Sequence, residues 1–174
     1  MNLKRINNND VSLSNYSGRV IILDFWATWC GPCKLELPGY IELYNTYKNK
    51  GLVIIGVTIW WDSIDEIVSS IQTNKINYPV LIGNDSVCNL YGGIDGVPTT
   101  LIINPQGQIV KTMIGYDNKK AFEDEINKWL QNTSPFILST SPENKETNVP
   151  IDTIIQAVFN KDINSTAFRW RSYI

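Results

Sequence analysis

The strongest hydrophobic signal in the chain is residues 20–26 (VIILDFW), an apolar run that is interrupted by one acid, Asp24. Residues 52–59 (LVIIGVTI) form a second run of the same kind. Continuous runs rich in β-branched residues are typical of parallel strands that are covered on both faces. We therefore predict that these two segments are buried strands at the centre of a sheet.

A helical pattern lies between the two runs. The first predicted helix begins after Cys30 and ends near Lys50, because Gly51 is a natural stop. Pro38 falls inside this helix and should kink it. Apolar faces on the helix are expected from Leu35, Ile41, Leu43, Tyr44 and Tyr47.

Two more amphipathic helices are predicted farther along the chain. Ser63 and Glu66 have the spacing of a capping box, which starts a helix that ends near Lys75. This helix repeats apolar positions with helical period at Ile64, Ile67, Val68 and Ile71. The last predicted helix covers residues 118–131. Its inward side chains are expected to be Phe122, Ile126, Trp129 and Leu130.

Shorter elements complete the pattern. Two apolar stretches within residues 1–17 predict an edge hairpin. Residues 79–82 are predicted as a short strand and residues 86–91 as a short helix. Residues 99–114 are predicted as a hairpin with Pro105 at the second position of its turn. Parallel crossovers followed by an antiparallel edge indicate an α/β fold with a mixed central sheet and helices on both faces.

The pattern changes after residue 132. Residues 133–174 are rich in Pro, Ser, Thr and Asn, and only residues 154–159 look like a strand. We predict one domain over residues 1–132. Residues 133–174 are predicted to be a linker with an incomplete fragment, which together form an irregular C-terminal tail.

Composition narrows the possible partners. The chain has 174 residues, a formal net charge of −2 and no histidine. Its charge gives no electrostatic reason to bind nucleic acid or an anionic membrane. No apolar run approaches the roughly 20 residues that span a bilayer, and the first residues do not resemble a signal peptide. Without histidine, proton transfer near neutral pH must use a perturbed carboxylate, a cysteine or water.

The candidate chemistry lies in residues 29–33 (WCGPC), directly after the first apolar run. A strand that leads into a helix at Cys30 places this sulfur near unpaired backbone N–H groups and the positive end of the helix dipole. Such a position favours the thiolate, which is the reactive form of cysteine. Cys33 lies one turn further on, close enough to form a disulfide. The pair therefore predicts dithiol–disulfide exchange.

Two other interpretations of the Cys-x-x-C pair remain. The same spacing occurs in zinc sites, but the chain offers no second Cys-x-x-C, no histidine and only one other cysteine, Cys88. We expect no metal and no cofactor. A purely structural disulfide is the other alternative. Cys88 itself is expected to be a small buried apolar residue, with a regulatory thiol as the alternative.

These residues resemble the thioredoxin superfamily, and most closely its TlpA/ResA-like branch of bacterial thiol–disulfide oxidoreductases. Residues 25–34 (FWATWCGPCK) look like the active-site signature of the family. Residues 96–100 (GVPTT) resemble the loop whose cis-proline, here Pro98, faces the cysteines. Residues 104–107 (NPQG) match the family hairpin, and the unit around residues 52–82 resembles the insertion of this branch. The resemblance covers about residues 3–131 and implies the thioredoxin fold.

The resemblance also assigns two acids to the site. Glu36 falls at the acidic position of the family's Cys-x-x-Glu-x-Pro run, which lies beside the cysteines. Asp24 matches the buried acid of thioredoxins, where many TlpA-like proteins have a neutral residue. The alternative for Glu36 is a solvated helix residue. For Asp24 a functional role is favoured, because an acid inside an apolar strand loses hydration energy.

The implied mechanism has two steps. Cys30, expected to be partly exposed, attacks a substrate disulfide, and the more buried Cys33 resolves the mixed disulfide. Asp24 or Glu36 would carry the proton of Cys33. The backbone of Val97 would pair with an extended substrate segment. The other substrate-contacting residues are expected to be Trp29, Gly31, Pro32 and Thr99.

The dipeptide Gly31-Pro32 is that of reducing thioredoxins, which predicts a reduction potential on the order of −270 mV. Expected partners are protein substrates with disulfides and a redox partner protein, with the chain itself a monomer.

A Trp60-Trp61 pair after the second strand is a candidate substrate-facing patch, although packing of at least one ring under the next helix is favoured. An extracytoplasmic location is favoured over the cytoplasm, with a role in redox homeostasis.

Two other functions remain open. A thiol peroxidase would want a Thr-x-x-Cys context and an arginine by the thiolate, but Thr28 is only two residues before Cys30. The chain could instead be a non-catalytic interaction module of a larger surface protein. Residues 135–168 resemble the opening of a bacterial Ig-like domain, of which only about a third is present. We expect this truncated tail to be poorly ordered or loosely docked.

Overall fold

The computed structural model describes residues 2–5, 10–60, 63–141 and 156–160. The chain divides into two compact units, Met1–Thr133 and Ser134–Ile174. The boundary predicted from sequence, after residue 132, differs from this division by one residue.

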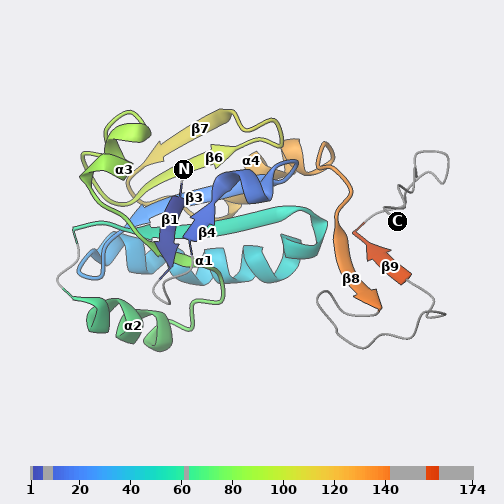
Figure 1. Ribbon diagram of the computed structural model, residues 1–174. Coiled ribbons are helices and arrows are strands. Elements are labelled where there is room, and N and C mark those ends of the chain that lie inside the picture. Colours follow the sequence, from blue (N-terminus) through green and yellow to red (C-terminus); the bar gives the residue numbers. More distant parts are fainter. Residues whose placement is uncertain (1, 6–9, 61–62, 142–155, 161–174) are drawn as a thin grey trace. The chain divides into compact units, whose positions relative to one another are not determined.

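The first unit is built on a seven-stranded mixed sheet with the order β2-β1-β5-β4-β3-β6-β7 (Figure 1). The centre is the parallel pair β3 (Val20–Trp26) and β4 (Leu52–Thr58), in which every residue is buried. The short strand β5 (Val80–Ile82) runs parallel to β4, whereas β6 (Thr99–Ile103) and β7 (Ile109–Ile114) are antiparallel. The two long apolar runs of the sequence are therefore the central strands, as predicted.

The predicted N-terminal hairpin is present at the other edge of the sheet. Strands β1 (Asn2–Arg5) and β2 (Asp10–Ser12) pair antiparallel, and β1 also pairs with β5. A 3-10 helix, η1 (Leu13–Tyr16), then leads toward β3. The β1–β2 pair extends the sheet beyond its parallel centre and covers the outer edge of β5.

Helices cover both faces of the sheet, as predicted. Helices α1 (Gly31–Tyr47), α2 (Ile64–Thr73) and α4 (Lys119–Leu130) pack on one face, and α3 (Asp85–Leu90) packs on the other (Figure 1). A short 3-10 helix, η2 (Lys48–Lys50), follows α1. These layers bury the two faces of the central strands and leave the carboxyl end of β3 to feed directly into α1.

Side chains at the helix starts explain where these helices begin. Ser63, Asn84 and Asn118 each accept a hydrogen bond from a backbone N–H of the first turn that follows, in α2, α3 and α4 respectively. Such caps satisfy donors that have no partner inside the helix. The predicted capping residue Ser63 is confirmed. Helix α1 is different, because the residue at its N-cap is Cys30.

The buried stripe of α1 differs from the prediction. Leu35 was expected on an apolar face, yet it is 68% exposed. The buried positions of this helix are Cys33, Glu36, Leu37, Tyr40 and Leu43. These positions follow the helical period, but Glu36 and Tyr40 carry polar groups. A prediction from apolar residues alone therefore did not identify the buried face of the helix. Pro38 lies inside the helix as expected.

The second unit contains a strand pair that the sequence did not predict. Strand β8 (Ile137–Ser141) pairs antiparallel with β9 (Gln156–Phe159). The backbone N–H of Phe136 donates to Oδ1 of Asn160 at 2.7 Å, and the N–H of Asn160 donates to the carbonyl of Phe136 at 3.1 Å. The prediction of a lone strand at residues 154–159 was wrong, because this strand has a partner in β8. The partner was missed because residues 137–141 are mostly polar and lack the pattern of a strand. Most of the segments that suggested an Ig-like domain lie outside the described residues.

Candidate active site

The Cys-x-x-C pair sits where β3 passes into α1. Cys30 is the N-cap residue of α1, and its Sγ accepts the backbone N–H of Cys33 at 3.1 Å. The two sulfurs form a disulfide with an S–S distance of 2.05 Å. A sulfur in this position lies at the end of the helix where backbone N–H groups and the helix dipole favour negative charge. The geometry thus provides for a thiolate at Cys30 when the disulfide opens.

The two cysteines differ less in exposure than the sequence suggested. Cys30 is 4% exposed and Cys33 is 2% exposed, so the expectation of a partly exposed Cys30 is not met in the disulfide form. The Cys30 sulfur is bonded to the sulfur of Cys33 in this form. The neighbouring residues Trp29, Gly31 and Pro32 are exposed, so the motif lies at the protein surface.

Exposed apolar side chains flank the motif. Trp29 is 57% exposed, and its indole N–H donates to the carbonyl of Trp60 at 2.9 Å. Trp60 itself is 42% exposed, and Leu35, the fifth residue of α1, is 68% exposed. Trp61 lies outside the described residues. This hydrogen bond holds the exposed indole of Trp29 in place beside the residues that follow β4.

The loop before β6 lies against the same cluster. The Val97–Pro98 peptide bond is cis, as the resemblance implies. Val97 is half-buried and packs against the apolar cluster that contains Cys30 and Cys33. Thr99 is buried, and its hydroxyl donates to the carbonyl of Gly96 at 2.8 Å. The side chain of Thr99 therefore holds the loop together.

Asp24 lies in the middle of the sheet beneath α1. Its neighbours across the strands are Gly56 on β4 and Thr100 on β6. Asp24 is 2% exposed, and burial together with the charge of Glu36 raises the pKa of its carboxyl well above the ordinary value. A side chain at Gly56 would crowd Trp26, because a Cβ there would lie 3.0 Å from the indole nitrogen. Glycine at this position, directly opposite Asp24 on the next strand, therefore leaves room for the Trp26 ring.

Glu36 lies one turn after Cys33 on the buried face of α1. It is 4% exposed, and its Oε1 accepts the backbone N–H of Asp117 at 2.7 Å, just before α4. Burial raises the pKa of Glu36 to about 7, although the hydrogen bonds from Asp117 and Tyr40 oppose the shift. The alternative of a solvated helix residue is therefore wrong, because the carboxyl is buried between two helices.

Two hydroxyl groups that the sequence reasoning missed join these acids. The hydroxyls of Tyr40 and Thr100 lie 2.8 Å apart. The Tyr40 hydroxyl also lies 3.5 Å from Oε2 of Glu36, and the Thr100 hydroxyl lies 3.5 Å from Oδ1 of Asp24. The sequence did contain a pattern that points to them. Tyr40 follows Glu36 by four residues, which places both on one face of the helix, and Thr100 lies two residues after Pro98.

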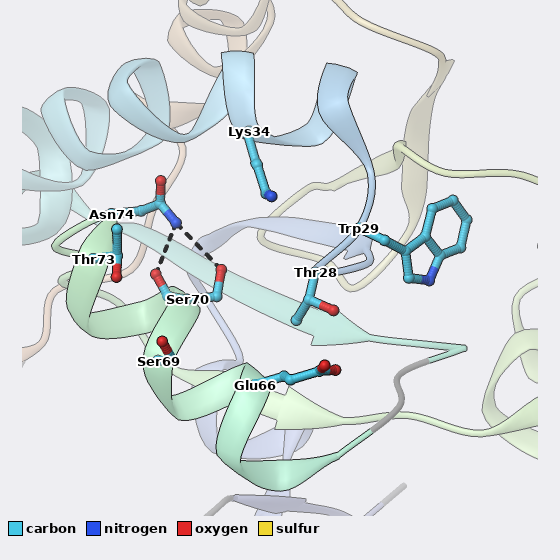
Figure 2. A pocket seen from close by; sticks show the side chains of 8 residues that line it. All are labelled: Thr28, Trp29, Lys34, Glu66, Ser69, Ser70, Thr73 and Asn74. Atoms are coloured by element: carbon cyan, nitrogen blue, oxygen red, sulfur yellow. Dashed lines mark hydrogen bonds between the residues drawn. The ribbon is translucent and has the colours of Figure 1, made fainter.

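A polar cleft adjoins the motif between α1 and α2 (Figure 2). It has a volume of about 480 Å³. Figure 2 shows Lys34 of α1 reaching toward it, with Glu66 and a row of Ser, Thr and Asn side chains contributed by α2. Asn74 is held by hydrogen bonds to Ser70. The inserted helix α2 therefore presents a hydrophilic wall next to Trp29 and Thr28.

The remaining cysteine is remote from this chemistry. Cys88 is a free thiol on the buried face of α3, in the apolar core, and burial raises the pKa of its thiol. Its position is that of a small core residue, as expected. Among the residues that the structure describes, no three His, Cys, Asp or Glu side chains gather as a metal site. In the same residues, no helix has the length and apolar character needed to cross a membrane.

Comparison with known proteins identifies the family. Residues 1–112 match the model of the AhpC/TSA family. The chain is 32% identical over 126 residues to the thiol-disulfide oxidoreductase ResA of Bacillus subtilis, a match that covers 72% of this chain and 69% of that protein. The protein therefore belongs to the AhpC/TSA family of thioredoxin-like proteins.

Solved structures agree with this assignment. StoA from Bacillus subtilis is 29% identical and superposes with a TM-score of 0.60 over 71% of this chain and 93% of that one. The thioredoxin domain of a thiol-disulfide oxidoreductase from Bacteroides vulgatus is 26% identical, with a TM-score of 0.64 over 73% of this chain and 93% of that one. The relatives and the redox pair Cys30–Cys33 make the protein a thiol–disulfide oxidoreductase, and they do not favour a peroxidase or a non-catalytic module.

The raised pKa of Glu36 predicts how stability depends on pH. The folded protein holds a proton on Glu36 up to about pH 7, whereas the unfolded chain releases it near the ordinary value of 4.5. The free energy of unfolding should therefore fall as the pH rises through this window, by about 1–2 kcal/mol after allowance for solvent screening. Asp24, whose pKa is also raised, adds a loss in the same direction.

Urea unfolding of the oxidised protein between about pH 5 and pH 8 measures this effect. The variant Glu36→Gln should have a clearly shallower pH dependence than the wild type. The matched control Glu42→Gln changes an exposed carboxylate on the same helix and should keep the wild-type slope. Equal slopes for Glu36→Gln and wild type would show that Glu36 does not hold its proton in the folded protein.

Proposed function

We propose that the protein reduces disulfides of protein substrates through the Cys30/Cys33 dithiol. The observation that carries this proposal is the position of Cys30 at the N-cap of α1, with its sulfur accepting the N–H of Cys33. In the reduced protein the same N–H and the helix dipole stabilise a thiolate at Cys30. Cys33 is then the resolving thiol, because it lies within bonding distance on the first turn.

The exchange has two balanced steps. The Cys30 thiolate attacks one sulfur of the substrate disulfide, which forms a mixed disulfide and releases the other sulfur as a thiolate. Cys33 gives its proton to a carboxylate and attacks Cys30, which releases the second substrate sulfur and closes the Cys30–Cys33 disulfide. Glu36 and Asp24 are the proton acceptors in this proposal, since both are buried acids beneath the motif.

The surface around the motif suggests how a substrate docks. Trp29, Trp60 and Leu35 are exposed apolar side chains, a combination that suits the apolar part of an unfolded or extended segment. The backbone at Val97 would pair with that segment as an added strand. Gly31 and Pro32 leave the approach to Cys30 free of long side chains, and Thr99 keeps the loop in shape through Gly96.

The same chemistry supports a proposal for the partners and the location. A reductase of this kind needs a second protein that returns electrons to the Cys30–Cys33 disulfide. An extracytoplasmic location fits an exchanger of structural disulfides, because such bonds persist in oxidising compartments. For residues 133–174 we propose a linker and the beginning of an Ig-like module, a proposal that the antiparallel pair of β8 and β9 supports.

Cysteine variants test the proposed roles directly. In an insulin-reduction assay Cys30→Ser should lower activity by about 1,000-fold or more, because the nucleophile is lost. Cys33→Ser should accumulate a mixed disulfide between Cys30 and substrate, visible on non-reducing gels. Cys88→Ala is the matched control, since Cys88 lies in the core of the opposite face, and it should retain activity.

The outcomes separate the candidate functions. Activity that survives Cys30→Ser would rule out the proposed mechanism. Absence of reduction in the wild type would favour the interaction module, and consumption of hydroperoxide without insulin reduction would favour the peroxidase.

The reduction potential tests the direction of exchange. From the Gly31-Pro32 dipeptide we expect a midpoint on the order of −270 mV, near that of reducing thioredoxins. Alkylation of the protein equilibrated in dithiothreitol redox buffers measures this midpoint. A value close to about −120 mV, the range of strong oxidants, would contradict a reducing role.

A further inference from the structure

A continuous row of four oxygen-bearing side chains runs beneath the redox pair. It passes from Asp24 on β3 to Thr100 on β6, then to Tyr40 and Glu36 on α1. The four residues are between 0% and 4% exposed, so water does not compete for these contacts. The ends of the row are carboxyl groups and the two inner members are hydroxyl groups.

The two hydroxyl groups of the row supply too few protons for its contacts. The row has three contacts, of which the shortest is the 2.8 Å contact between the hydroxyls of Thr100 and Tyr40. Each hydroxyl supplies one proton, which makes two protons for three contacts. If one hydroxyl proton fills the central contact, only one is left for the two outer contacts. The remaining outer contact is a hydrogen bond only when its carboxyl group carries a proton.

With both acids ionised, each hydroxyl would donate outward to a carboxylate. The two hydroxyl oxygens would then face each other at 2.8 Å with no proton between them, which is unfavourable in a buried site. With one proton on either acid, all three contacts become hydrogen bonds that point in one direction along the row. The direction reverses according to which acid holds the proton.

We propose that Asp24, Thr100, Tyr40 and Glu36 act as one unit that holds a single shared proton, with Thr100 and Tyr40 as positioning residues that link the two acids. The proton resides on Asp24 or on Glu36, and the two hydroxyls reorient to follow it. Glu36 lies three residues after Cys33 on the same buried helix face, so this end of the row adjoins the resolving thiol.

This inference rests on the proposed function for its role in exchange. The unit without its shared proton accepts the proton of the Cys33 thiol, which leaves a Cys33 thiolate and completes the third hydrogen bond of the row. The thiolate then attacks Cys30 and displaces the substrate sulfur. One proton moves from sulfur to the unit, and no other reactant is consumed. The unit returns this proton to the released substrate thiolate or to solvent.

Other titratable groups face the unit. Tyr78, which precedes β5, is buried next to it, and its hydroxyl has no hydrogen-bond partner among the described residues. The proximity of Asp24 and Glu36 raises the pKa of Tyr78 in addition to the effect of burial. Asp117, before α4, contacts Glu36 through its backbone N–H. Both phenols, Tyr40 and Tyr78, remain neutral near pH 7, so the shared proton belongs to the two acids.

Carbon-13 NMR of the side-chain carboxyl groups in the oxidised protein tests this proposal without any assay of activity. In the wild type, the carboxyl signals of Asp24 and Glu36 should both respond in the same two pH steps, as coupled groups do. In Thr100→Val and in Tyr40→Phe the link is broken. Only the direct charge interaction between the two acids then remains. The first proton loses the stabilisation of the linked row, so the two pH steps should move closer together by about one pH unit or more.

Two controls separate the link from general damage to the core. Thr100→Ser keeps the hydroxyl and should restore the coupled titration. Thr58→Val removes a buried hydroxyl that donates to the carbonyl of Leu81, and it should leave both carboxyl titrations unchanged. The pH at which insulin reduction reaches half its maximum should shift in Thr100→Val and return in Thr100→Ser.

Independent single-step titration of the two acids in the wild type would overturn the proposal, even if a variant failed to fold. Unchanged carboxyl titrations in both Thr100→Val and Tyr40→Phe would overturn it as well. A protein that shows coupled carboxyl titration but no insulin reduction would retain the shared proton and lose the reductase proposal. The two failures are therefore distinguishable.

Discussion

The hydrogen bond from the N–H of Cys33 to the sulfur of Cys30 is the interaction on which the site depends. It exists because β3 ends at Trp26 and α1 begins directly after Cys30, so that a sulfur occupies the N-cap position. Other helices of this protein use Ser or Asn at the same position. Replacing the usual oxygen by sulfur turns a structural cap into a reactive group.

The central strands set the second constraint. Strand β3 is buried on both faces, and Asp24 is the one acid in it. Its carboxyl has no access to water, so it must either hold a proton or find donors nearby. The side chains that meet it come from β6 and α1, and this arrangement ties the redox motif to the proline loop before β6. Burial raises the pKa of both acids, so the free energy of unfolding falls as the pH rises from their ordinary pKa values toward the raised ones.

The sequence was sufficient for the parts of the fold that local patterns determine. The runs at residues 20–26 and 52–59 predicted the central strands, and Ser63 predicted the start of α2. Leu35 and the strand at residues 137–141 were misjudged, because local polarity does not reveal which helix face is covered or which polar strand finds a partner. The cysteines were predicted as the site from their Cys-x-x-Cys spacing, and the two acids from the resemblance to the thioredoxin superfamily. Tyr40 and Thr100 were missed, since their contact joins residues 60 positions apart and exists only in the folded chain.

The proposed mechanism depends most directly on a stabilised thiolate at Cys30 in the reduced protein. Its rate of alkylation by iodoacetamide measures the thiolate population, with Cys33→Ser as the background so that no disulfide forms. We expect Cys30 at pH 7 to react clearly faster in the folded protein than in the same variant unfolded in urea, because the N-terminus of α1 stabilises the charge. Equal rates in the folded and unfolded states would contradict the central claim.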